Sequence, residues 1–159
     1  YAGYSEQGPD YLYNVHRLLQ KFDTAKSLVP QPVIKKAKRS TTLGAIYFGS
    51  TSPSMAEAIE VLEVENTHLD TLRLRAFPFP DSVAEFIAQH DTVFVVEQNR
   101  DSQMRSLLVN EFGINPAKLV PILHYDGTPI TARFIVHAIS AAVSATQRIH
   151  QHSDKVATP

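Results

Sequence analysis

The sequence predicts an α/β domain in which helices cover both faces of a mostly parallel sheet, giving a three-layer α/β/α sandwich. Two features carry this prediction. Short continuous apolar runs, typical of strands buried on both faces, alternate with segments of helical periodicity. Hydrophobic residues make up 43% of the 159 residues, enough for one compact core, and there are no cysteines, so no disulfide supports the fold.

The first segment, residues 1–32, is predicted to be a helical arm that precedes the domain. Pro9 and Asp10 favour the first turn of a helix. The helix should end near Leu28, because two prolines follow closely. Its apolar residues recur at helical spacing and need a partner to cover them, since an isolated helix of this length is marginal in water: Val15, Leu18, Leu19 and Phe22.

A basic run at 35–39 follows the arm. Such a run serves as a targeting or phosphate-binding patch in some proteins, and as a solvated linker or hairpin turn in many more. We expect a linker or turn here.

Four strands are predicted from the residues. The runs at 43–48 and 92–97 are apolar throughout and should lie in the middle of the sheet. The segment at 69–76 alternates apolar and polar residues, which predicts a half-buried strand further out. Pro121 has no amide hydrogen for a ladder, so the strand at 119–123 should lie at an edge.

Four helices are predicted to follow these strands. The first begins at Pro53 or Ser54 and the second at Asp81 or Ser82, both of which are favourable helix starts. The third covers residues 102–112, with Gly113 at its C-terminal cap, and the fourth covers residues 131–149. The domain therefore occupies residues 33–149, and residues 150–159 are expected to form a flexible tail.

Candidate chemistry lies in the loops after the strands, because open parallel sheets bind ligands and partners at their carboxyl edge. Residues 49–53 could hold an anion on backbone amides, but the loop has one glycine and no lysine. The alternative is a capping turn in which Gly49 lets strand and helix pass closely. The loop after the strand at 92–97 is more polar. We expect it to form an interface or an active-site wall rather than a catalytic site, through Glu97, Gln98, Asn99 and Arg100.

Other functions find little support in the sequence. The formal net charge of −1 argues against nucleic-acid binding by bulk positive charge, and no apolar run approaches the ~20 residues that span a bilayer. The histidines show no metal-ligand spacing, and His124 with Asp126 is a weak acid–base pair. Without cysteine the chain can form neither a thiolate nucleophile nor a cysteine-held iron–sulfur cluster.

Several longer phrases resemble one family. The most specific runs from Val93 to Met104 and contains Val95-Val96-Glu97-Gln98-Asn99-Arg100-Asp101-Ser102. It is joined by the phrases at 45–51, 72–80, 124–131 and, in the arm, 13–25. Together they resemble the C-terminal part of the alpha subunit of 2-oxoglutarate:ferredoxin oxidoreductase, in the 2-oxoacid:acceptor oxidoreductase family. Since the chain begins at Tyr1 without a methionine, we expect a fragment of such a subunit.

The resemblance implies a transketolase C-terminal-like domain with five strands, one antiparallel to the rest. The segment at 31–36 is the candidate for the fifth strand, which is expected near 33–37, beyond 69–76. The resemblance also implies oxidative decarboxylation of a 2-oxoacid to its acyl-CoA, with electrons passed to ferredoxin. Thiamine diphosphate, Mg²⁺ and an iron–sulfur cluster would be held by other domains, so no cofactor is expected in this chain. The implied partners are the beta subunit, the rest of the alpha subunit, ferredoxin and coenzyme A, with neither nucleic acid nor membrane. The implied location is cytoplasmic. The alternative is a non-catalytic binding or interaction module that uses its strand-end loops.

Overall fold

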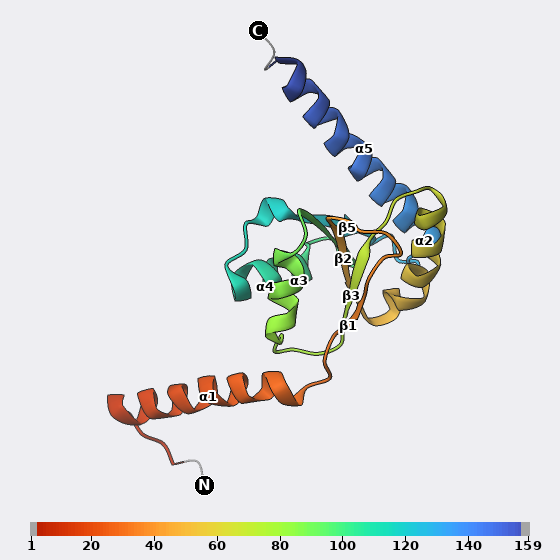
Figure 1. Cartoon of the computed structure of the whole chain (residues 1–159). Helices are drawn as coiled ribbons and strands as arrows, with labels where there is room; N and C mark the ends of the chain where they lie inside the picture. The colour runs from red at the N-terminus through yellow and green to blue at the C-terminus, as the bar shows by residue number, and fades with distance from the viewer. Residues whose placement is uncertain (1–2, 157–159) are drawn as a thin grey trace.

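A computed structural model describes residues 3–156, with side chains as far as residue 145. Its centre is a five-stranded sheet of order β1-β3-β2-β4-β5, in which β1 alone runs antiparallel to its neighbour. Figure 1 shows helices on both sides of this sheet, and helices at both ends of the chain that extend from the body. The strands are β1 (Val33–Lys35), β2 (Leu43–Phe48), β3 (Asp70–Leu74), β4 (Thr92–Glu97) and β5 (Leu119–Leu123).

The two faces of the sheet carry separate apolar layers because successive residues of a strand point to opposite sides. Helices α2 (Ser52–Val64) and α5 (Ala132–Val156) cover one face. Helices α3 (Asp81–Ala88) and α4 (Gln103–Phe112) cover the other. In β2, for example, Ala45 lies in the first layer and Ile46 in the second, and both are fully buried. The three-layer sandwich predicted from the sequence is therefore confirmed.

The order of the strands also agrees with the prediction. The two continuously apolar strands, β2 and β4, lie side by side in the interior of the sheet. In β5, Pro121 pairs with Val95 of β4, and β5 has no further neighbour in the sheet, so the missing amide hydrogen costs no ladder bond. Strand β1 forms the other edge and pairs antiparallel with β3, as the resemblance implied.

Strand β3 departs from the half-buried strand that was predicted. It is shorter than expected and lies inside the sheet between β1 and β2. As a result even its polar members Asp70 and Thr71 are only 6% and 5% exposed. The alternation of apolar and polar residues indicated that one face of β3 is solvated. In the structure β3 is covered at its side by the edge strand β1 and on its faces by the two apolar layers.

The basic run is a linker between β1 and β2, as expected, but it is not a hairpin turn, because β3 separates these two strands. Two of its lysines are engaged within the domain. The ammonium group of Lys36 lies 2.7 Å from a carboxylate oxygen of Asp70, and that of Lys38 lies 2.5 Å from Glu63. These charges serve the fold rather than forming a free patch.

The ends of the chain extend from the sandwich (Figure 1). Helix α1 (Gly8–Leu28) has no buried residue, and its Phe22 ring makes a T-shaped contact with Phe77 of the domain, with 6.4 Å between the ring centroids. Helix α5 continues to Val156, beyond the expected end at 149. The flexible tail at 150–159 stays a prediction, and its last three residues lie outside the described part. None of the described helices has the length and apolarity to cross a bilayer.

Candidate functional site

The carboxyl edge of the sheet has a topological switch point between β2 and β4. The chain leaves β2 toward β3 on one side and reaches β4 on the other, so the loops that follow these adjacent strands diverge. Crevices of this kind are where open α/β sheets bind ligands. A cavity of about 460 Å³ lies there, with Ser50, Thr51, Gln98, Asn99 and Gln103 among its polar lining.

Glu97, the first of the four predicted residues, points inward. It is fully buried at the end of β4 and accepts three hydrogen bonds. Its carboxylate binds the amides of Met104 and Arg105 at 2.7 and 3.0 Å, and the side-chain amide of Asn99 at 2.8 Å. Those two backbone amides belong to the first turn of α4, where hydrogen-bond donors lack partners and negative charge is favoured. Glu97 therefore caps the N-terminus of α4, although it lies six residues before the helix begins.

Gln98 is exposed and holds three loops together. Its side-chain nitrogen donates to the hydroxyl oxygens of Ser50 at 3.1 Å and Thr51 at 3.2 Å, in the loop after β2. Its side-chain oxygen accepts from the amide of Ile130 at 3.3 Å, just before α5. The loops that follow β2, β4 and β5 thus meet at this one side chain.

Asn99 and Arg100 complete the loop in different ways. The side-chain oxygen of Asn99 accepts from the amides of Asp101 and Gln103, at 3.1 and 3.2 Å, which closes the turn that enters α4. Ser102 adopts a left-handed conformation in this turn, with φ of 51°. The guanidinium of Arg100 is largely exposed and contacts only its neighbour Asp101, at 2.7 Å. Of the four predicted residues, Arg100 is the one whose charge faces outward.

Gly49 does not bring strand and helix close together, as the capping-turn interpretation had it. No atom lies within 4 Å of where its Cβ would be, and its φ of +58° is the feature that requires glycine. Close passage occurs instead at Gly44, where a Cβ would stand 3.0 Å from the Phe86 ring and 3.1 Å from the His90 ring.

His124 and Asp126, judged a weak pair from sequence, do come together. Their side chains approach to 3.1 Å at a cavity of about 500 Å³ beside the start of α5. The hydroxyl and then the amide of Thr128 lower the pKa of Asp126 below its ordinary value. His124 Nε2 lies 2.9 Å from the Thr128 carbonyl, which can only accept, so that nitrogen carries a proton. The pair therefore stabilises its own loop.

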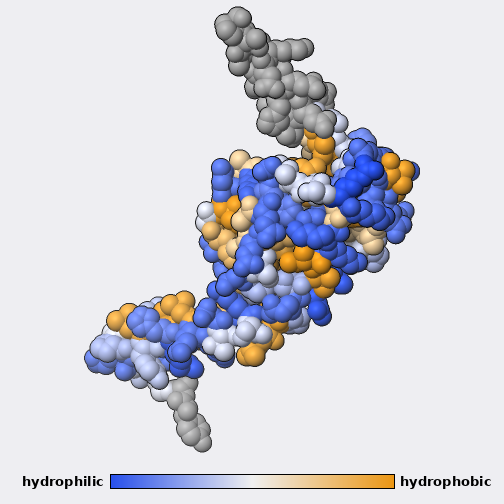
Figure 2. All heavy atoms as spheres, in the orientation of Figure 1, coloured by the Kyte–Doolittle hydropathy of each residue, from blue (hydrophilic) through white to orange (hydrophobic). Residues whose placement is uncertain are grey.

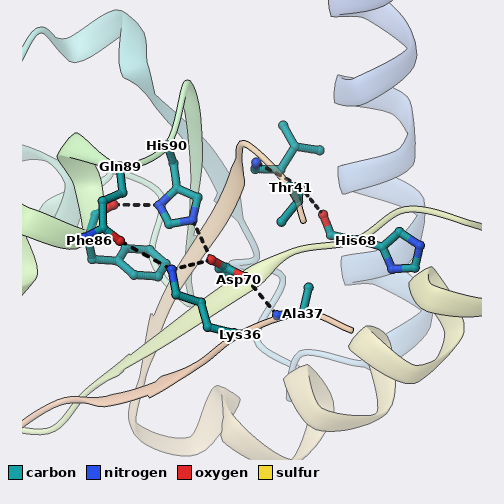
Figure 3. Close-up of polar contacts among 9 residues, drawn as sticks. Lys36, Ala37, Thr41, His68, Asp70, Phe86, Gln89 and His90 are labelled. Carbon is teal, nitrogen blue, oxygen red and sulfur yellow. Dashed lines mark hydrogen bonds and ion pairs between the residues drawn. The ribbon is translucent and has the colours of Figure 1, made fainter. Parts of the chain in front are cut away.

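A buried polar cluster that the sequence analysis did not find lies at the opposite, amino edge of the sheet (Figure 3). Asp70 accepts hydrogen bonds from Lys36 at 2.7 Å and from the amide of Ala37 at 2.8 Å, and His90 Nε2 lies 3.1 Å away. Burial raises the pKa of Asp70, but the hydrogen bonds from Lys36, Ala37 and His90 outweigh it and hold this pKa below its usual 3.8. The cluster ties the segment after β1 to β3 and to the end of α3.

His90 joins two segments through its two ring nitrogens. Its Nδ1 lies 2.6 Å from the carbonyl of Phe86, which accepts and cannot donate, so Nδ1 carries a proton. Its Nε2 lies 3.1 Å from the Asp70 carboxylate. The cluster therefore works as a structural clamp. Its residues are far apart in sequence, and no spacing rule would have joined them.

The described residues bring no group of three or more potential metal ligands together. The whole chain also lacks cysteine. The chain therefore has no thiolate to hold an iron–sulfur cluster, and the described residues of the carboxyl edge offer hydrogen-bonding groups, an exposed arginine and the His124–Asp126 pair.

Solved structures share this architecture. The 2-oxoglutarate:ferredoxin oxidoreductase from Magnetococcus marinus, with 2-oxoglutarate, coenzyme A and succinyl-CoA bound, matches with a TM-score of 0.75 at 20% identity, over 86% of this chain and 24% of that one. A split-gene transketolase, an inactive beta4 tetramer, matches with a TM-score of 0.54 at 19% identity, over 72% of this chain and 41% of that one. This chain thus spans about a quarter of the first and two-fifths of the second.

A third structure, the alpha chain of a probable 2-oxoacid ferredoxin oxidoreductase from Thermoplasma acidophilum, matches at 23% identity over 72% of this chain and 97% of that one, but its TM-score of 0.48 is too low to support an argument. No protein-family model matches the sequence, and no curated protein matches it. The chain has the three-layer fold of transketolase C-terminal-like domains. More particularly, it is similar in structure to the domain of this kind in 2-oxoglutarate:ferredoxin oxidoreductase.

Proposed function

We propose that this chain is the C-terminal domain of the alpha subunit of a 2-oxoacid:ferredoxin oxidoreductase, with 2-oxoglutarate as the substrate of the whole enzyme. The extent of the structural match carries the proposal. Residues 33–159 make up about four-fifths of the chain, whereas the match to the Magnetococcus enzyme covers 86% of it and so extends into the arm. The match to the transketolase covers 72% of the chain, a share that the domain without the arm is large enough to supply.

The phrases of the sequence support the same assignment independently. The loop from Glu97 to Arg100 is part of the longest phrase that resembles the family, and it lies at the carboxyl edge. In this proposal the exposed Gln98 and Arg100 and the half-buried Asn99 contact the beta subunit or line its active site. Glu97 supports the loop from inside.

The chemistry would then lie outside this chain. Thiamine diphosphate, Mg²⁺ and the iron–sulfur cluster would be held by other parts of a cytoplasmic enzyme, which would also bind coenzyme A and ferredoxin. The chain itself supplies no cysteine for a cluster, so it is expected to be inert when alone. Calorimetry on the chain with thiamine diphosphate and Mg²⁺ should show no micromolar binding, and tight Mg²⁺-dependent binding would overturn this division of labour.

The decisive experiment uses the complete alpha subunit co-purified with its beta subunit. Reduction of ferredoxin should require both coenzyme A and 2-oxoglutarate, and pyruvate should be a poor substitute. Arg100→Ala should weaken subunit association or activity, since truncating one partner of a buried charged pair typically costs ~2–5 kcal/mol. Arg39→Ala is the matched control, because Arg39 is exposed at the amino edge. Equal effects of the two substitutions, or no 2-oxoacid-dependent reduction, would count against the proposal.

A further inference from the structure

Helix α1 exposes an apolar stripe that the described chain leaves largely uncovered, although the ring of Phe22 touches Phe77 of the domain. It is 21 residues long and has no buried residue, although helices in water gain most of their stability from packing. Figure 2 shows apolar side chains along the upper side of α1, with polar ones below. The large members of the stripe are 46–71% exposed: Tyr11, Leu12, Leu18, Leu19 and Phe22.

The spacing of the stripe is that of a helix-pairing seam. Leu12, Val15, Leu19 and Phe22 are separated by three, four and three residues, which is the a/d pattern of a heptad repeat. Tyr11 and Leu18 stand beside the seam, seven residues apart. A seam of this kind fits a second helix with the same periodicity.

The seam is also palindromic, because three, four and three read the same in both directions. In an antiparallel pair of two copies, Leu12 would face Phe22 of the partner subunit and Val15 would face Leu19 of the partner subunit. The two-fold symmetry repeats each of these contacts once, so the pair has four layers in all. A surface that complements itself in this way is what a two-fold dimer requires.

Charge favours the antiparallel arrangement over the parallel one. Lys26 continues the seam in the a position. Two parallel helices would set the two Lys26 side chains against each other inside the seam, which costs stability. In the antiparallel pair, Lys26 lies opposite Gly8 of the partner subunit at the end of the helix, where its charge stays in water.

The area is sufficient for such a dimer. At about 200 Å² for each fully exposed large side chain, the five exposed fractions correspond to roughly 600 Å² per copy. Two copies would bury roughly 1,200 Å², the lower end of the range for specific interfaces. Monomers rarely leave a contiguous apolar surface of this size exposed.

We propose that α1 is a dimerisation element, which pairs antiparallel with α1 of a second copy through Leu12, Val15, Leu19 and Phe22. The contact of Phe22 with Phe77 then sets the angle at which each domain leaves the helix pair, because the Phe22 ring lies in the seam and also packs against the domain. This inference does not depend on the enzyme family, since it rests on the stripe alone.

Sedimentation equilibrium on the chain over a range of concentrations tests the association. The wild type should be a dimer at the higher concentrations. Leu19→Asp should weaken the dimer at least about a hundredfold, because the substitution acts twice across the axis and each copy places a carboxylate in an apolar layer. Gln20→Asp adds the same residue to α1 outside the seam and should change the association less than about threefold. A monomer throughout, or equal effects of the two variants, overturns the proposal.

Single-cysteine variants test the direction of the pair, and the natural chain offers no competing thiol. The two copies of Leu18 lie close to the two-fold axis, so Leu18→Cys should form a disulfide-linked dimer on mild oxidation. In the antiparallel pair the two copies of Leu12 are offset by ten residues, or ~15 Å, so Leu12→Cys should not. Efficient linkage through position 12 would show a parallel pair and refute the arrangement. Circular dichroism of each variant confirms that it is folded.

Discussion

Replacing Glu97 with glutamine tests whether the carboxylate serves the fold from inside the domain. The substitution keeps the size and shape of the side chain and removes its charge. One side-chain oxygen of Glu97 accepts from Arg105, and the other accepts from both Met104 and Asn99. Glutamine has one oxygen only, and its amide nitrogen cannot accept. The least costly orientation therefore keeps the two bonds to Met104 and Asn99 and leaves the Arg105 amide without a partner.

The cost follows from these contacts. A hydrogen bond to a charged group contributes ~1.5–3 kcal/mol, and one such bond is lost. The two bonds that remain become neutral, and the first turn of α4 loses a negative charge worth ~0.3–1 kcal/mol. Together these effects predict that Glu97→Gln lowers the free energy of unfolding by about 2–4 kcal/mol.

Urea denaturation of the chain at neutral pH, followed by far-ultraviolet circular dichroism, measures this loss. With an m-value of ~2 kcal/mol/M, the midpoint should fall by about 1–2 M. Glu111→Gln is the control, because it removes the same charge from an exposed position on the same helix and should change stability by less than ~0.5 kcal/mol. If the two variants behaved alike, the capping role of Glu97 would be refuted.

Three further substitutions probe the amino-edge cluster, the close approach at Gly44 and the loop junction. Asp70→Asn should lower the free energy of unfolding by about 3 kcal/mol at neutral pH. Because the pKa of Asp70 is lowered in the fold, its carboxylate stabilises the fold at a pH above the unfolded-state pKa, and this stabilisation is lost when Asp70 is protonated, so the difference from wild type should shrink as the pH falls below about 4. A pH-independent difference in urea midpoint would contradict this. Gly44→Ala should cost ~1–3 kcal/mol by thermal unfolding, because the new methyl group meets the buried rings of Phe86 and His90, and an unchanged melting temperature would show that these rings yield freely. Gln98→Ala should raise the hydrogen-exchange rate of the Ile130 amide while changing global stability by no more than ~1 kcal/mol, whereas unaltered exchange would show that the loops hold together without it.

The sandwich and its strand order followed from local signals. Apolar runs marked β2 and β4 as interior strands, and the missing amide hydrogen of Pro121 marked an edge. Strand β1 has only three residues, all exposed, so no burial pattern could identify it, and it was found through a resemblance. The same short strand made β3 an interior one, which explains why the alternation in β3 suggested more solvent exposure than the structure has.

The candidate site was located by the rule that polar loops gather at the carboxyl ends of parallel strands. That rule brought Glu97 and Gln98 to the correct edge, but it could not say which way each side chain turns. The direction of Glu97 depends on unpaired amides at the start of α4, and these are properties of the backbone rather than of any residue type. The cluster of Lys36, Asp70 and His90 joins three segments by contacts that exist only in the folded chain.

The junction at Gln98 limits how the three loops can change in length. Because one amide group contacts Ser50, Thr51 and Ile130, an insertion that moved either flanking loop away would break contacts in the other as well. Loops on a protein surface ordinarily accept insertions one at a time. Here, grafting a longer loop after β2 would require a matched change before α5, or a longer side chain at position 98. Anyone redesigning this edge should therefore treat the three loops as one unit and exchange them together.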